Sequence, residues 1–92
     1  MNNKIIVFTL NGCEHCVNLV EKLDELNIPY TELEINKNQE IWNSVVSQTG
    51  HNSLPSVFIK TGEDDTGPVY VPGRDFKSQV EIVEIIKMFT ET

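Results

Sequence analysis

The chain has 92 residues, of which 39% are hydrophobic and 23% charged, a balance typical of one small folded domain, so we expect residues 1–92 to form a single domain. Fourteen acidic against seven basic residues give a formal net charge of -7, and no basic run offers phosphate contacts, which argues against a nucleic-acid partner. The apolar runs are too short to cross a bilayer and the first residues do not resemble a signal peptide, so we expect a soluble, cytoplasmic protein without membrane contact.

The first third of the chain predicts a strand followed by a helix. Residues 4–9 form a β-branched and aromatic run with apolar side chains on both faces, which is typical of a strand in the middle of a sheet. From Cys13 onward apolar residues recur at helical spacing, until Asn27 and Pro29 end the pattern. We therefore expect a central strand and a helix that starts at the cysteines.

The middle of the chain predicts a second strand and a second helix. Residues 30–35 alternate, with two glutamates on one face, as in a half-exposed edge strand. Asn36 and Gln39 have the spacing to cap a helix that ends at Gly50. Trp42 falls on the apolar stripe of this helix, so we interpret it as a core residue.

The last third predicts an antiparallel hairpin, formed by residues 56–60 and 69–71, and a final helix. Ser78 and Glu81 have the spacing of a capping box at the start of that helix. Its expected apolar face comprises Val80, Ile82, Val83, Ile85, Ile86 and Phe89. Since a strand-helix-strand unit makes its strands parallel, the predicted fold is α/β, a mixed four-stranded sheet flanked by three helices in the order βαβαββα.

The cysteine pair is the motif that carries chemistry. Cys13 and Cys16 lie where a predicted strand ends and a helix begins, which is the context of a redox-active pair. A helix N-terminus favours an anion, so the pKa of such a cysteine can fall from about 8.5 to between roughly 3.5 and 7.5. We expect Cys13 to be the exposed attacking thiolate. Cys16, one turn later on the apolar stripe, is the shielded thiol that resolves the mixed disulfide.

Other interpretations of the two cysteines are weaker. A purely structural Cys13-Cys16 disulfide would close a very short loop and stabilise little. A structural zinc site needs about four ligands, and only His15 and His51 could join the cysteines, so we predict no metal site of this kind. Glu14 and His15 shift the pKa of Cys13 in opposite directions. We expect the helix N-terminus to dominate, so that the pKa of Cys13 is lowered.

Three blocks of sequence resemble the glutaredoxin family. They are Phe8 to Cys16, Leu54 to Ile59 and Val71 to Asp75, which occur in the order of that family's active-site loop, cis-proline segment and glycine-aspartate segment. The resemblance covers nearly the whole chain and implies the thioredoxin fold and glutathione-dependent thiol-disulfide exchange through Cys13 and Cys16. It also implies a cis Leu54-Pro55 bond opposite the sulfurs, which proline makes accessible at a cost of about 0.5 to 1 kcal/mol.

The same resemblance implies glutathione as a co-substrate and no tightly bound cofactor. The γ-glutamyl carboxylate would lie at the start of the last helix, a site that suits an anion. The substrate-binding residues so implied are His15, Leu54, Pro55, Gly73, Arg74 and Asp75. The expected partners of this monomer are glutathione and disulfide-bearing proteins, with ribonucleotide reductase among the candidates.

Some positions depart from the family's pattern. Leu10 stands where glutaredoxins usually carry a lysine, and Asn52 and Ser53 occupy a segment that is often basic. Pro72 replaces a glycine and Phe76 an acid. These departures leave open a redoxin reduced by thioredoxin reductase that supplies electrons to ribonucleotide reductase. The resemblance also leaves open a glutaredoxin that binds an iron-sulfur cluster between two subunits.

Overall fold

The computed structural model describes residues 4–61 and 67–90, so the centre of the predicted hairpin loop lies outside the described residues. The elements are β1 (Lys4–Thr9), α1 (Glu14–Glu25), β2 (Thr31–Glu34), the 3-10 turn η1 (Ile35–Lys37), α2 (Gln39–Thr49), β3 (Ser56–Lys60), β4 (Val69–Tyr70) and α3 (Gln79–Thr90). This order confirms the predicted βαβαββα arrangement. In these two stretches, every helix is too short or too polar to cross a membrane.

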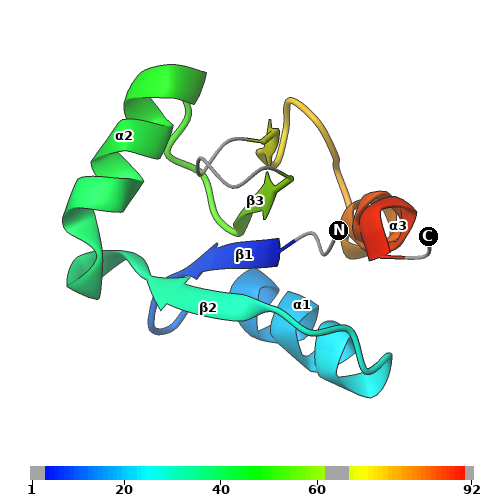
Figure 1. The fold of residues 1–92 in the computed structure, drawn as a ribbon. Coiled ribbons are helices and arrows are strands. Elements are labelled where there is room, and N and C mark those ends of the chain that lie inside the picture. The colour runs from blue at the N-terminus through cyan, green and yellow to red at the C-terminus, as the bar shows by residue number, and fades with distance from the viewer. Residues whose placement is uncertain (1–3, 62–66, 91–92) are drawn as a thin grey trace.

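The strands form one mixed sheet in the order β2-β1-β3-β4 (Figure 1). β1 runs parallel to β2 and antiparallel to β3, and β4 pairs antiparallel with β3. The prediction that the first strand is central and the second lies at an edge is confirmed. The parallel pair places α1 as the crossover between β1 and β2, as a strand-helix-strand unit requires.

The core consists of two clusters, one on each side of the sheet. Ile5 and Val7 of β1 pack with the buried residues of α1 and α3, whereas Phe8, which points to the opposite face, packs with Trp42 and Val45 of α2. The Phe8 and Trp42 ring centroids lie 5.3 Å apart. The interpretation of Trp42 as a core residue is confirmed, and truncating either ring to alanine would cost roughly 3 to 5 kcal/mol.

Two details of the predicted helices were wrong. Asn36 does not cap α2, because it lies inside η1, where the Glu34 carboxylate accepts hydrogen bonds from the backbone N-H groups of Asn36 and Lys37. Val80 does not belong to the buried face of α3, since it is 70% exposed. At about 100° per residue, Val80 lies roughly 60° from Val83 but roughly 120° to 160° from Ile86 and Ile82, so it lies at the edge of the buried face.

The N-terminus of α3 shows most of the predicted capping box. Ser78 Oγ accepts a hydrogen bond from the Glu81 N-H at 3.3 Å. The Glu81 carboxylate reaches back to the N-H of Lys77, at 3.1 Å, one residue before the expected partner. These bonds fix the start of α3 beside the site described next.

Candidate active site

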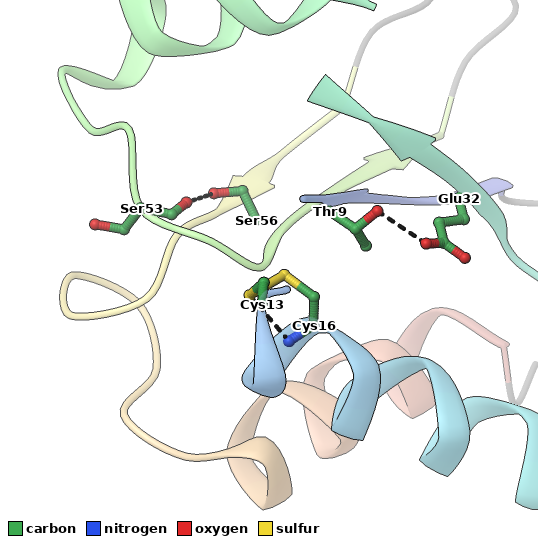
Figure 2. Close-up of a disulfide and its surroundings, with 6 residues drawn as sticks. All are labelled: Thr9, Cys13, Cys16, Glu32, Ser53 and Ser56. Atoms are coloured by element: carbon green, nitrogen blue, oxygen red, sulfur yellow. Dashed lines mark hydrogen bonds between the residues drawn. A yellow bond between two sulfur atoms is a disulfide. The ribbon is translucent and has the colours of Figure 1, made fainter. Parts of the chain in front are cut away.

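The cysteine pair lies at the N-terminus of α1, where Cys13 is the N-cap residue (Figure 2). Cys13 and Cys16 form a disulfide, with their Cα atoms 5.3 Å apart, so the prediction that they lie within bonding reach is confirmed. The Cys16 N-H donates to Cys13 Sγ at 3.2 Å. Cys13 is half-buried, whereas Cys16 is 1% exposed. The two sulfurs therefore differ in access to solvent, as predicted.

A tight turn between β1 and α1 brings Cys13 to the helix end. The Cys13 N-H donates to the Leu10 carbonyl at 3.0 Å, and Gly12 adopts a φ of 84°, a conformation that favours glycine. At an N-cap, the side chain accepts from free backbone N-H groups of the first turn. The Cys13 sulfur takes that role here, which stabilises negative charge on it.

The Leu54-Pro55 peptide bond is cis, as the sequence predicts. Pro55 is buried and Leu54 half-buried. The hydroxyl of the fully buried Ser56 donates to the Ser53 carbonyl at 2.7 Å, which holds the loop before β3 in place (Figure 2).

An open groove of about 410 Å³, which we call the front groove, lies beside the cysteine pair. The residues that line it include His15, Leu54, Pro55, Pro72, Lys77 and Ser78. It therefore joins the centre of the Cys13-Cys16 motif, the cis-proline loop and the N-terminus of α3. Lys77 is its cation, and the free N-H groups at the helix start add positive potential.

The predicted residues Gly73, Arg74 and Asp75 form a turn next to the front groove and are not among its lining residues. The Arg74 guanidinium pairs with Asp75 Oδ2 at 2.8 Å and donates to the Val69 carbonyl at 2.9 Å. Asp75 Oδ2 also accepts from the Val71 N-H at 2.8 Å.

These contacts lower the pKa of Asp75. Partial burial opposes ionisation of its carboxyl group, but the hydrogen bonds from Arg74 and Val71, with the charges of Arg74 and His51, hold the pKa below the usual value. The Arg74 guanidinium therefore already has a carboxylate partner within the chain.

The two histidines occupy different places. His15 is exposed and lines the front groove. His51 follows the C-terminus of α2, where its N-H donates to the Thr49 hydroxyl at 3.1 Å. Among residues 4–61 and 67–90, no group of three or more His, Cys, Asp or Glu side chains is arranged to hold a metal ion.

A second cavity of about 190 Å³, which we call the back pocket, adjoins Cys16. The residues that line it include Thr9, Leu10, Cys16, Glu21, Glu32 and Glu34. The hydroxyl of Thr9 donates to Glu32 Oε2 at 2.9 Å. Neither Thr9 nor Glu32 was predicted as a site residue. The available signal was Thr9, which follows the apolar run from Ile5 to Phe8, four residues before the first cysteine.

Comparisons with known proteins place this geometry in a wider class. A thioredoxin-like protein, BC3987, matches with 25% identity and a TM-score of 0.66, over 90% of this chain and 99% of its own. A buckwheat glutaredoxin solved with glutathione matches with 20% identity and a TM-score of 0.62, over 97% of this chain and 78% of its own. The fold is therefore thioredoxin-like, with a cysteine pair at the position where β1 leads into α1.

The sequence identifies the family within that class. The glutaredoxin family model matches residues 5–63, so the chain belongs to the glutaredoxin family. Glutaredoxin 1 of Rickettsia conorii is 37% identical over 57 residues, which cover 60% of this chain and 56% of that protein. Glutaredoxin 1 of Rickettsia typhi is 35% identical over 57 residues, 60% of this chain and 55% of its own. The chain thus matches little more than half the length of these relatives.

Proposed function

We propose that this protein is a dithiol thiol-disulfide oxidoreductase that reduces protein disulfides and glutathione mixed disulfides. The observation that carries the proposal is the asymmetry of the cysteine pair. Cys13 is a half-buried N-cap whose sulfur accepts a backbone N-H, and Cys16 is 1% exposed within bonding reach. An accessible, stabilised thiolate followed by a shielded thiol is the arrangement that two-step disulfide exchange requires.

The reaction proceeds through a mixed disulfide. The Cys13 thiolate attacks one sulfur of the substrate disulfide, forms a Cys13-S-S-R bond and expels the other half as a thiolate. Cys16 then loses its proton and attacks Cys13 Sγ, which closes the Cys13-Cys16 disulfide and releases the second substrate thiolate. Two electrons have moved from the protein to the substrate, and two thiols of a reductant return them.

Glutathione is the reductant that we propose. The front groove presents Lys77 and the N-terminus of α3 beside the motif, and both favour an anion such as the γ-glutamyl carboxylate. The buckwheat relative was solved as a complex with glutathione. Because Arg74 is already paired with Asp75, we assign the cationic role to Lys77.

A coupled assay tests the proposal. Oxidation of NADPH is followed with a disulfide substrate, using glutathione plus its reductase in one series and thioredoxin reductase in the other. We expect turnover with glutathione, and Lys77→Gln raises the half-saturating glutathione concentration up to about fivefold, the value of an exposed ion pair. Lys87→Gln, at the other end of α3, is the matched control and changes little.

Each outcome has a distinct meaning. Turnover with thioredoxin reductase alone would overturn glutathione dependence and leave the dithiol mechanism intact. A reduced protein whose Cys13 does not react with disulfides at all would overturn the mechanism itself.

A further inference from the structure

An open groove of about 440 Å³, which we call the side groove, is lined by residues of α1 and α3. The two helices lie on the same side of the sheet, where their buried residues share one core cluster. The residues that line the side groove include Lys22, Leu26, Val80, Val83, Glu84 and Lys87. Its lining therefore combines apolar side chains with one lysine from each helix.

The apolar part of the side groove extends from the core to the surface. Val83 is 4% exposed, Leu26 is half-buried and Val80 is 70% exposed. Val80, Val83, Glu84 and Lys87 follow one another at helical spacing, so they lie along one stripe of α3. An apolar side chain of a partner that enters the side groove covers Val80, which the chain itself leaves in contact with water.

The two lysines of the side groove have only weak partners within the chain. Lys22 Nζ lies 3.9 Å from Glu25 Oε1, and Lys87 Nζ lies 3.9 Å from Glu84 Oε1. The two glutamate side chains are 71% and 66% exposed, and exposed ion pairs of this kind contribute little. Since the chain has a net charge of -7, most of its surface repels an acidic partner. A lysine on each side of an apolar groove is where carboxylates of such a partner bind.

The side groove adjoins the front groove at Gln79, which lines both. Gln79 Nε2 donates to the Asn18 carbonyl at 2.9 Å and so joins the start of α3 to α1. With Lys77 in the front groove, three of the seven basic residues line these two adjoining grooves. From Gln79 to Lys87, α3 rises by about 12 Å. An extended peptide, at about 3.3 Å per residue, covers that length with about four residues.

We propose that the side groove is a docking surface for protein substrates that carry an acidic segment with an apolar side chain a few residues from the reactive cysteine. This inference rests on the proposed dithiol function. The apolar side chain packs between Leu26 and Val80, and carboxylates on either side of it bind Lys22 and Lys87. A tripeptide such as glutathione spans at most about 11 Å, so from the front groove it does not reach Lys87. The side groove therefore selects among protein substrates and leaves the use of glutathione unchanged.

The test uses synthetic peptides, each with one cysteine in a mixed disulfide with a coloured aromatic thiol. Reduced protein attacks the peptide sulfur through Cys13, and the aromatic thiolate that leaves is followed by stopped flow. In an acidic peptide, a leucine about six residues from the cysteine is flanked by aspartates, and in its neutral counterpart by asparagines. One pair of peptides has this segment after the cysteine and a second pair has it before, so that both chain directions are tested.

For one of the two pairs, we expect wild type to react with the acidic peptide between about twofold and thirtyfold faster than with the neutral one, the range for two exposed ion pairs. High salt removes the preference. The double variant Lys22→Gln, Lys87→Gln reacts with both peptides at the rate of the neutral one. Glu84→Gln, which removes a competing carboxylate from Lys87, increases the preference. Val80→Ser slows the reaction with the acidic peptide by no more than about tenfold, because a buried valine contributes no more.

Lys37→Gln is the matched control, because Lys37 is an exposed lysine of η1 that does not line the side groove, and it keeps the preference. Equal rates for the acidic and neutral peptides of both pairs in wild type overturn the docking surface. A preference that survives in the double variant, or that disappears in Lys37→Gln, overturns it as well. A wild-type protein that releases thiolate from none of the peptides would instead overturn the proposed dithiol function.

Discussion

The front groove is lined by His15 of the cysteine motif and the back pocket by Cys16, and the two cavities differ in charge. The front groove has Lys77 and the start of α3, which favour an anionic ligand. The back pocket has three glutamates, whose negative charges disfavour a thiolate at Cys16. Two sulfurs only three residues apart can therefore act in a fixed order, with Cys13 attacking first and Cys16 second.

Removal of either sulfur should change disulfide exchange more than any other substitution considered. We expect Cys13→Ser to abolish all disulfide exchange, because the shielded Cys16 cannot reach a substrate. Cys16→Ser should still attack and should then accumulate a mixed disulfide on Cys13. Mass spectrometry of the intact protein after reaction with a disulfide measures both. Equal residual activity in the two variants would refute the assignment of roles.

The next largest effect concerns the turn that borders the front groove. Asp75→Asn should lower the free energy of unfolding by about 1 to 2 kcal/mol at pH 7, since a hydrogen bond to a charged group contributes roughly 1.5 to 3 kcal/mol and Asp75 is partly exposed. The folded pKa of Asp75 lies below its usual value. The stability that the ionised Asp75 carboxylate adds to the fold is therefore complete above the usual Asp pKa of about 3.9. It is lost as the pH falls through the lower pKa that Asp75 has in the folded protein.

Urea unfolding of wild type and Asp75→Asn, at pH 7 and near pH 2, measures this linkage. The gap between the two proteins should shrink at the lower pH. Glu84→Gln, whose carboxylate lies 3.9 Å from Lys87 with 66% of its side chain exposed, is the surface control and should stay within about 0.5 kcal/mol of wild type. A difference in the free energy of unfolding that stays the same near pH 2 would mean that the charge of Asp75 contributes nothing to stability.

The smallest effect concerns Leu10, the position where the family usually carries a lysine. Leu10 lines the back pocket with Glu21, Glu32 and Glu34, so a lysine there has carboxylates as competing partners. We expect Leu10→Lys to lower the half-saturating glutathione concentration by no more than about fivefold, as for an exposed ion pair, and salt should remove the gain. The glutathione dependence at low and high ionic strength measures it. A larger, salt-resistant gain would show that the two cavities do not act separately.

The sequence predicts the front of this site better than the back. The positions of Cys13 and Cys16 at the start of α1 follow from a local pattern, the Gly12 turn and the N-cap. The cis bond at Pro55 follows from the resemblance to glutaredoxins. The back pocket depends on register, because only the pairing of β1 with β2 brings Glu32 beside Thr9. The alternation of polar and apolar residues along residues 30–35 indicated that Glu32 faces solvent. No neighbouring residue in the sequence indicated which side chain it would contact.

The turn at Arg74 shows the same limit. The resemblance to glutaredoxins implied that Arg74 binds the ligand, and the contacts of its guanidinium with the neighbouring Asp75 and with the Val69 carbonyl do not follow from the sequence pattern. The start of α2 is a further case, since the Glu34 carboxylate caps η1 and delays the helix to Gln39. In each case a side chain contact, absent from the pattern of apolar spacing, decides the outcome.

The rate of alkylation of each thiol as a function of pH distinguishes an attacking Cys13 from a resolving Cys16. The reduced wild-type protein is treated with a small alkylating reagent, and the modified peptides are quantified for Cys13 and Cys16 separately. We expect Cys13 to react as a thiolate at clearly lower pH than a free cysteine, whose pKa is about 8.5, and Cys16 to stay protected until higher pH. Equal pH profiles for the two thiols, or earlier modification of Cys16, would contradict the division between an attacking and a resolving sulfur.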